Sequence, residues 1–422
     1  MSEWTEAPLH RLASFQKGRK VETSPERLPG YERYLGASGL AGLPDGFAST
    51  SSAIRASEHD VLMLWDGERS GLVGYGQAGV VASTVSRLSP TGEVDGRFLY
   101  YALAHNFEWI QNRRTGSGVP HVPKEIGRIL QVPYPRCQQT QQRISAILTS
   151  IDNAIEATEA LIEKHQQIKA GLMHDLFTRG VSSAGACRPS PADAPSLYED
   201  SDIGPLPKGW SLSPLHSLLA PVANNLRSGP FGSALLKQEL SESGIPLLGI
   251  DNIHVERFVP QYSRFVSDRR FLGLLRYAVR PRDVVITIMG TVGRCCVLPE
   301  DIGTALSSKH LWSMTLDAGR VIPELVCLQL NHLPWARAWF RRGGQGGIMD
   351  AIQSSTLKSL RLPTPSMEEQ ERIAAIYAAM QSRIERDETR LAKLRAQKLG
   401  LMQDLLTGKV RVPEAPAAAA HA

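Results

Sequence analysis

The chain has 422 residues, of which 42% are hydrophobic and 21% are charged, and these proportions are typical of a globular protein with room for two or three domains. The formal net charge of +5 permits nucleic-acid binding without requiring it. No apolar run approaches the roughly 18 residues of a membrane span, and the N-terminal residues lack the basic and apolar regions of a signal peptide. The five cysteines form no CxxC pair and no disulfide-like framework, so we expect a reducing cytoplasm.

The first part of the chain, residues 1–132, carries short runs that are rich in apolar and β-branched residues and are broken by glycines. Residues 60–64 (Asp-Val-Leu-Met-Leu), which two glycines follow, are a clear example. Such runs predict short strands and tight turns. We therefore expect a mixed α/β domain here.

A long helix is predicted over residues 133–180. It follows a Pro-x-Pro pair, and glycine is absent until its last turns, where Gly180 is a plausible terminator. Its apolar residues recur at alternating three- and four-residue steps, which indicates one narrow apolar stripe. The stripe consists of Ile144, Leu148, Ile151, Ile155 and, after Thr158, Ile162.

Residues 181–207 are rich in Ser, Ala and Pro, a composition typical of a linker. Residues 208–362 then repeat the pattern of the first domain more faintly: residues 283–287 (Asp-Val-Val-Ile-Thr) parallel residues 60–64, and glycines again follow. A second mixed α/β domain is expected over this part of the chain.

A second long helix is predicted over residues 363–412, again after a Pro-x-Pro pair and with Gly408 as a plausible terminator. Ser366 and Glu369 have the spacing of a capping box at its start. The Ala-rich residues 413–422 are expected to form a disordered tail.

The two helical segments are copies of each other. Residues 143–178 return as residues 372–407, an offset of 229, and both copies contain Gly-Leu-Met-x-Asp-Leu near their ends. Helices of about 50–60 Å, at 1.5 Å per residue, with a narrow apolar stripe need a partner. Each could pack only on its own domain, but length and duplication favour an antiparallel pair. The predicted fold class is α+β: two mixed α/β domains separated by two long helices that pair as an antiparallel coiled coil, with pseudo-twofold symmetry.

Several short motifs follow one another in a fixed order. They are residues 62–67 (Leu-Met-Leu-Trp-Asp-Gly), 116–122 (Gly-Ser-Gly-Val-Pro-His-Val), 207–210 (Pro-Lys-Gly-Trp), 228–233 (Ser-Gly-Pro-Phe-Gly-Ser), 243–246 (Ser-Gly-Ile-Pro) and the two helix ends. With these motifs, nearly the whole chain resembles the specificity subunit of type I restriction–modification systems. One departure is residues 137–140 (Cys-Gln-Gln-Thr), where the second copy carries acidic residues.

The resemblance implies a DNA-reading subunit without catalysis of its own. Each target-recognition domain would read one half of a bipartite target in double-stranded DNA, and the paired helices would fix the unread spacer. Two modification (methyltransferase) subunits would dock on the helices, and restriction subunits would join them in the full complex. No cofactor is then expected on this chain, because S-adenosylmethionine belongs to the modification subunits and ATP and Mg²⁺ to the restriction subunit.

Candidate DNA contacts are side chains that can hydrogen-bond to bases or phosphates and that lie near glycine-bearing loops. For each of them the alternative is an ordinary solvated surface or turn residue. Trp4 and Trp210, which occupy matching positions, are interpreted as core residues instead. The candidates are Arg113, Arg114, Ser117, His121 and Lys124 in the first domain, and Arg227, Ser228, Phe231, Ser233, Lys237, Arg294, Ser308, Lys309 and His310 in the second.

Four matching residues at the helix ends, Lys169, Asp175, Lys398 and Asp404, are candidates for binding the partner subunits. Identical residues on both copies suit two identical partners, although charges there can also serve only the dipole of their own helix.

The rival classes are a DNA methyltransferase or nuclease and an orphan two-headed DNA-binding protein without modification subunits. A methyltransferase of exocyclic amino groups would need a [DNS]-P-P-[YFW] tetrapeptide and a glycine-rich cofactor loop, and neither is present. The sequence also holds no HExxH, no metal-spaced Cys/His cluster and no Walker loop, so we expect no metal and no catalytic site. Neither the DNA target nor the spacer length can be read from one sequence.

Overall fold

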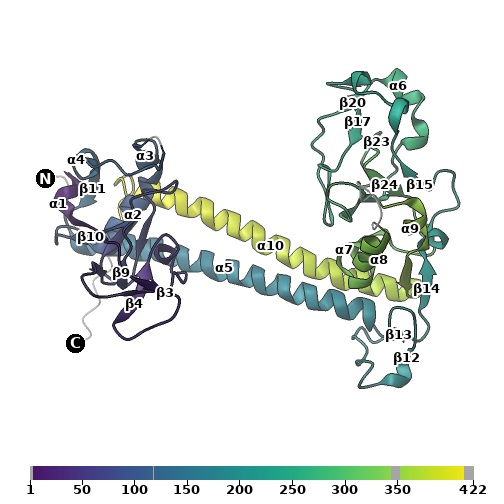
Figure 1. The fold of residues 1–422 in the computed structure, drawn as a ribbon, viewed down its shortest axis with the longest axis horizontal. Coiled ribbons are helices and arrows are strands. Elements are labelled where there is room, and N and C mark those ends of the chain that lie inside the picture. Colours follow the sequence, from purple (N-terminus) through teal and green to yellow (C-terminus); the bar gives the residue numbers. More distant parts are fainter. Residues whose placement is uncertain (1–2, 117, 344–351, 413–422) are drawn as a thin grey trace, which may run out of the picture. The chain divides into compact units, whose positions relative to one another are not determined.

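The computed structural model describes residues 3–116, 118–343 and 352–412. The chain divides into two compact units, which we call unit 1 (Met1–Ile162 with Asp387–Ala422) and unit 2 (Glu163–Arg386). Two long helices, α5 (Gln138–Thr178) and α10 (Met367–Leu405), each contribute one part to unit 1 and another to unit 2 (Figure 1).

The folded domain of unit 1 contains two main sheets. One has four strands in the order β2-β10-β7-β8, and the other has five in the order β3-β5-β4-β9-β6, with β4 and β9 parallel. A separate antiparallel pair joins β1 (Trp4–Pro8) to β11 (Gln131–Pro135), which lies directly before α5. The remaining elements are α1 (Leu9–Leu12), β2 (Ala13–Lys17), β3 (Thr23–Ser24), β4 (Tyr31–Leu35), β5 (Phe47–Ser49), β6 (Arg55–Ala56), β7 (Val61–Leu64), β8 (Val73–Tyr75), β9 (Gly79–Val81), β10 (Val85–Pro90), α2 (Gly96–His105), α3 (Phe107–Gln111) and α4 (Ile126–Ile129).

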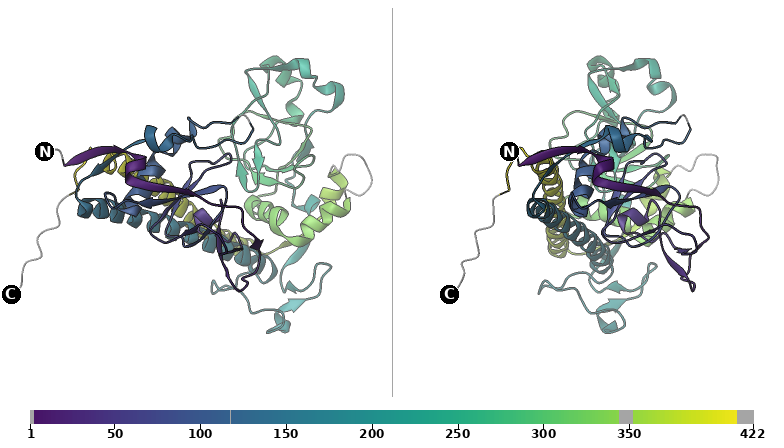
Figure 2. Two further views of the ribbon diagram at one scale, coloured as in Figure 1. Left: turned by 60° about the vertical axis from the view of Figure 1, so that its left-hand side comes forward. Right: turned by 90° about the vertical axis from the view of Figure 1, so that its left-hand side faces the viewer.

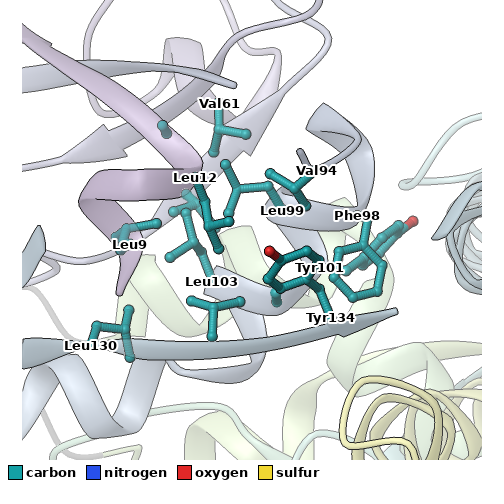
Figure 3. Close-up of a cluster of buried hydrophobic side chains, with 14 of the residues drawn as sticks. Leu9, Leu12, Val61, Val94, Phe98, Leu99, Tyr101, Leu103, Leu130 and Tyr134 are labelled. Carbon is teal, nitrogen blue, oxygen red and sulfur yellow. The ribbon is translucent and has the colours of Figure 1, made fainter. Parts of the chain in front are cut away.

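The core of unit 1 lies beside α2. The helix begins where the carboxylate of Asp95 accepts hydrogen bonds from the backbone N–H groups of Arg97 and Phe98. Phe98 and Leu99 are fully buried, and burying such side chains stabilises a fold by about 1.5–3 kcal/mol each. Figure 3 shows them in one cluster with side chains from other elements, among them Leu9, Leu12, Val61, Leu130 and Tyr134.

Unit 2 repeats this topology. It contains a four-stranded sheet in the order β15-β24-β21-β22, a second sheet β16-β20-β17-β23 with β17 and β23 parallel, and a pair β14-β25 directly before α10. Its elements are β12 (Tyr198–Glu199), β13 (Leu206–Pro207), β14 (Ser211–Pro214), β15 (Leu226–Ser228), β16 (Leu240–Ser241), β17 (Ile245–Leu248), β18 (Ile253–His254), β19 (Arg257–Phe258), β20 (Phe265–Val266), α6 (Asp268–Leu272), β21 (Val284–Thr287), β22 (Cys295–Val297), β23 (Leu306–Ser307), β24 (Leu311–Met314), α7 (Pro323–His332), α8 (Pro334–Gly343), α9 (Ser354–Ser359) and β25 (Arg361–Thr364).

Within each unit, the parts of α5 and α10 that belong to it lie side by side, as can also be followed in Figure 2. In unit 1 the ammonium group of Lys398 on α10 lies 2.6 Å from a carboxylate oxygen of Asp152 on α5. In unit 2 the ammonium group of Lys169 on α5 lies 3.0 Å from the side-chain oxygen of Gln381 on α10. Lys398 and Gln381 are the copies of Lys169 and Asp152, so the pairing is antiparallel and repeats with the duplication. The predicted fold class is confirmed.

Both helices also pack on the folded domain of each unit. Ile144 and Leu148 of α5 share the core of unit 1 with Met402 and Leu405 of α10. The predicted alternative, in which each helix packs only on its own domain, is therefore wrong. The ends agree with the prediction: Gly180 and Gly408 follow the two helices with φ of 66° and 71°, a conformation that favours glycine.

The capping box predicted at the start of α10 is only half present. The hydroxyl of Ser366 accepts a hydrogen bond from the backbone N–H of Glu369 at 3.4 Å. The carboxylate of Glu369 points instead to Arg188 and to the indole N–H of Trp210, because these donors reach it in a buried position. Trp210 is itself 5% exposed, which confirms its predicted place in the core.

The segment expected as a linker, residues 181–207, has structure of its own in unit 2. Strands β12 and β13 pair within it, and Arg188 binds Glu369 of α10 in an ion pair. The expected disordered tail, residues 413–422, lies outside the described residues.

Candidate nucleic-acid interface

One edge of the four-stranded sheet in unit 1 gathers polar side chains. Strand β2 ends there at Lys17, and the loop after β7 places Asp66 beside it, with 2.8 Å between the ammonium and carboxylate groups. The same carboxylate lies 2.7 Å from Nδ1 of His121. Arg19 and Lys20, which follow β2, are exposed. This edge therefore carries cations on loops that a duplex could approach.

The predicted candidates of the first domain lie close to this edge. The guanidinium of Arg113 stacks over the ring of Trp109, 3.9 Å from its centroid, and the guanidinium of Arg114 donates to the backbone oxygen of Glu68 in the loop after β7. Both arginines and Lys124 are exposed. The candidate Ser117 lies outside the described residues.

The corresponding edge of unit 2 contains a hollow of about 240 Å³. Four predicted candidates line it together with Arg264, which the sequence analysis missed. The hydroxyl of Ser308 is buried in its wall without a hydrogen-bond partner among the described residues. Two further candidates, Phe231 and Ser233, lie in the loop after β15 and are exposed. The four candidates are Lys237, Ser308, Lys309 and His310.

His310 and Arg264 also line a second hollow of about 410 Å³. Burial, followed by the charges of Lys309 and Arg264, lowers the pKa of His310, so its imidazole is neutral at pH 7. A neutral imidazole carries one donor and one acceptor and can hydrogen-bond to a base edge without adding charge.

The remaining arginine candidate, Arg294, lines a separate hollow of about 590 Å³ with Arg337 and Arg341. No carboxylate is among the residues that line this hollow in the described chain. Arg337 was not predicted from the sequence, because an arginine on a short amphipathic helix such as α8 cannot be distinguished by sequence from an ordinary solvent-exposed arginine.

Two predicted DNA contacts of the second domain prove to be buried. The side chain of Arg227 is 4% exposed and pairs with the fully buried carboxylate of Asp283, and it also donates to the hydroxyl of Thr315. Ser228 is 8% exposed, with its hydroxyl 3.5 Å from the backbone oxygen of Lys309. A guanidinium held in this way cannot reach DNA, so the prediction for Arg227 is wrong, and Ser228 offers little surface.

The four candidate partner contacts have intramolecular neighbours. Lys169 binds the carboxylate of Glu256 at 3.0 Å as well as Gln381, and Lys398 binds Asp152. Asp175 pairs at 3.3 Å with Arg179, which directly follows α5. The copy of Asp175, Asp404, is partly exposed on α10. Their binding to partner subunits stays a prediction.

No group of three or more His, Cys, Asp or Glu side chains that could hold a metal ion occurs in residues 3–116, 118–343 and 352–412. Within the same described part of the chain, no helix is both long and apolar enough to cross a membrane.

Comparison with known proteins shows what the chain is similar to. Residues 1–167 match the model of the type I restriction modification DNA specificity domain. The chain is 24% identical over 421 residues to the specificity subunit of the type I restriction enzyme MjaVIII of Methanocaldococcus jannaschii, over 97% of this chain and 93% of that one.

Solved structures share the fold. The S subunit of a type I restriction–modification system from M. genitalium superposes with a TM-score of 0.57 and 16% identity, over 98% of this chain and 97% of that one. A chain from a structure on complex assembly and conformational transition of a type I restriction–modification system gives a TM-score of 0.57 and 14% identity, over 96% of this chain and 98% of that one. Residues 1–167 therefore match the DNA specificity domain of type I restriction–modification systems, and over nearly its whole length the chain is similar in sequence and fold to specificity subunits of such systems.

Proposed function

We propose that this chain selects the DNA target of a type I restriction–modification complex. Residues 1–132 and 208–362 are its two target-recognition domains, and each reads one half of a bipartite target in double-stranded DNA. The observation that carries the proposal is the repeated topology: the same four-stranded sheet presents different polar side chains at its corresponding edge in each unit. One scaffold with two different edges suits a target with two different halves.

Electrostatics supports DNA as the ligand of these edges. Exposed cations such as Arg19, Lys20 and Lys124 in unit 1 and Lys237 and Lys309 in unit 2 can neutralise phosphates. Arg264, which lines both hollows, is by contrast held in place by Asp251 and can contact a base edge.

The paired helices set the unread spacer in this proposal. A continuous helix of 41 residues, α5, spans about 60 Å at 1.5 Å per residue. Two DNA-reading modules on the same side of a duplex engage successive major-groove faces when they lie about 34–36 Å apart. Helices of this length are sufficient to hold such modules at a fixed separation.

The helices also offer surface to further subunits. Leu399 on α10 is 67% exposed and Ile168 on α5 is 43% exposed, although both belong to otherwise amphipathic helices. With Lys169, Asp175, Lys398 and Asp404, these residues are the proposed docking sites of two modification subunits. Restriction subunits join in the full complex.

In this assignment the chain contributes no catalytic group. Methyl transfer from S-adenosylmethionine belongs to the modification subunits, and ATP with Mg²⁺ serves the restriction subunit. A subunit that acts on cellular DNA in this way works in the cytoplasm.

Mapping methylated adenines tests the proposal. DNA from a naive host that carries this chain with its modification subunit should show one bipartite motif with a fixed gap, and the motif should disappear when the chain is omitted. A stable complex that leaves no motif would overturn the proposed function.

A further inference from the structure

Arg264 stands at the junction of the two hollows at the sheet edge of unit 2, because its side chain lines both of them. The side chain is one-third exposed, and its guanidinium is held by Asp251, with 2.5 Å between Nη2 and the carboxylate oxygen Oδ1. It is therefore accessible and also fixed in direction, which distinguishes it from the flexible lysines around it.

A pinned loop, residues 249–252, positions this ion pair. The buried side chain of Asn252 accepts a hydrogen bond from the backbone N–H of Gly249 at 2.8 Å and donates to the backbone oxygens of Val259 and Gln261. Gly249 has no side chain, and a Cβ added there would collide with the guanidinium of Arg264. The loop sequence therefore makes room for the arginine and orients its partner Asp251.

The charge of the pair favours a base edge over a phosphate. Arg264 and Asp251 are together neutral, and the carboxylate would repel the full charge of a phosphate more strongly than the partial charges of an uncharged acceptor pair. A guanidinium fork matches the O6 and N7 acceptors of guanine. Lys237 and Lys309, on the same hollow, form no ion pair within the described chain and suit phosphates better.

Two further observations distinguish this place: one points to a ligand, and the other shows that the arginine is specific to unit 2. The hydroxyl of Ser308, which is 5% exposed, lines the same hollow as Arg264 and has no hydrogen-bond partner in the part of the chain that the structure describes. In unit 1 the corresponding backbone position is Gly46, because Tyr34 donates to its oxygen just as Leu247 donates to the oxygen of Arg264. The arginine is thus a feature of one domain and not of the shared scaffold.

We propose that Arg264, oriented by Asp251, reads a guanine in the half-site bound by the second target-recognition domain. Arg264 is then a specificity-determining residue, while Lys237 and Lys309 position the DNA backbone. The assignment rests on the proposed function.

The test selects DNA with the complex of the full chain and its modification subunits from a pool of randomised duplexes. The parent complex should enrich a bipartite motif in which at least one position of the half-site read by the second target-recognition domain is a G·C pair. Arg264→Ala should retain one half-site and the gap, and lose about tenfold or more of the preference for guanine at a single position in the other half. Gly249→Ala keeps every charge but displaces the guanidinium, so it should produce the same loss.

Two variants serve as controls. Lys309→Ala should leave the motif unchanged, weaken binding to all sequences equally and reduce the slope of log affinity against log salt by about one. Arg361→Ala removes an arginine from another exposed ion pair of unit 2, with Asp202, and should change neither quantity.

The outcomes separate the two proposals. No enriched motif for the parent complex would overturn the proposed function and with it this assignment. A parental motif that Arg264→Ala leaves unchanged, with a uniform loss of affinity and a smaller salt slope, would overturn the assignment alone and make Arg264 a phosphate contact.

Discussion

A buried glutamine joins each long helix to the domain before it. The amide nitrogen of Gln141, at the start of α5, donates to the backbone oxygens of Pro135 and Glu93 at 2.8 and 3.1 Å. Its amide oxygen accepts from the backbone N–H of Asp95 at 2.6 Å, directly before α2. Because Gln141 is fully buried, the three bonds are made without water.

Its copy, Gln370 at the start of α10, makes the same three bonds. The amide nitrogen donates to Pro365 and Arg320, both at 3.0 Å, and the amide oxygen accepts from the backbone N–H of Ile322 at 2.9 Å, directly before α7. The duplication has therefore kept both the residue and its function in fixing the helix to its domain.

Replacing Gln370 by Leu should lower the free energy of unfolding by about 2–4 kcal/mol, because two backbone oxygens and one N–H would stay buried and unpaired. Urea unfolding followed by circular dichroism measures the change. Gln138→Leu is the matched control: Gln138 is an exposed helix residue with one hydrogen bond, to the oxygen of Gly92, and should change little. Equal effects of the two substitutions would contradict this interpretation of Gln370.

Glu369 makes the stability of unit 2 depend on pH. Burial raises the pKa of its carboxyl, but hydrogen bonds from Arg188, the backbone of Val181 and Trp210 outweigh burial, and the pKa lies below its ordinary value of 4.5. A carboxyl with a lowered folded-state pKa stabilises the fold fully above the unfolded-state value, and this stabilisation is lost as the pH falls through the folded-state pKa.

The melting temperature of the parent should therefore fall below about pH 4.5 more steeply than that of Glu369→Gln. At pH 7 the variant should be less stable by up to about 3 kcal/mol, since the partly buried guanidinium of Arg188 would lose its charged partner. Melting curves at pH 7 and pH 4 measure both effects. Glu159→Gln, in the exposed pair with Arg395, is the control and should follow the parent. Parallel pH profiles for the parent and Glu369→Gln would count against this account.

At the level of single residues, the repeat reveals which positions correspond, but burial and long-range contacts are visible only in the structure. The repeat aligns Gln141 with Gln370, so their correspondence was visible without coordinates, whereas their burial and hydrogen bonds were not. The burial of Arg227 was not visible, because it depends on Asp283, which lies 56 positions later in the chain and meets the arginine only in the folded sheet. Arg264 was missed for a related reason: a pinned loop distinguishes it from other surface arginines, and its neighbours in sequence do not.

Among elements, the long helices were predictable and the short strands less so. The predicted stripe on α5 is buried at Ile144 and Leu148 and again at Ile162, with the buried Thr158 between them. A periodic pattern over 40 residues is strong evidence for a helix. Strands of two to six residues carry much weaker patterns, and the pair β12-β13 arises within a segment whose composition indicates a linker.

The ion pair between Lys398 and Asp152 should contribute to the pairing of α5 and α10 in unit 1. The phenol O–H of Tyr101 on α2 also donates to Asp152, at 2.8 Å. The carboxylate of Asp152 therefore contacts both the partner helix α10 and the folded domain of unit 1. Asp152→Lys should lower the free energy of unfolding by about 1–2 kcal/mol, because like charges would then face each other in a partly buried position.

A double-mutant cycle isolates that interaction. Lys398→Asp alone should also destabilise unit 1, whereas the double variant should recover part of the loss, which urea unfolding can measure. The exposed pair of Glu159 and Arg395, reversed in the same way, should show coupling close to zero. Additive losses in the cycle of Asp152 and Lys398 would indicate that the pair does not stabilise the helices.

At the scale of the whole molecule, the duplication extends further than sequence identity indicates. Asp60 and Asp283 lie before matching strands, β7 and β21. Each accepts a hydroxyl hydrogen bond at the end of the neighbouring strand, from Ser89 in β10 and from Thr315 directly after β24. The sequence signal was limited to short runs, because surface loops diverge freely while the sheet order is kept by a few buried groups. The fold class could be predicted from the repeat, whereas the contents of each recognition edge required coordinates.

The proposed spacer function of the helices predicts the effect of lengthening both of them. Four residues inserted after Ala157 in α5 and four after Arg395 in α10 lie opposite each other, because Arg395 pairs with Glu159. The insertion adds about 6 Å, or roughly one helical turn. The methylated motif should keep both half-sites and gain about one or two base pairs of unread gap.

A length-matched insertion controls for the added residues. Four residues placed after Gly185, in a turn with open space around it, leave both helices intact and should leave the gap unchanged. Methylation mapping in the naive host compares the parent with both insertions. Changed half-sites with an unchanged gap would show that the helices do not set the spacer, since a spacer element alters separation and leaves recognition as it was.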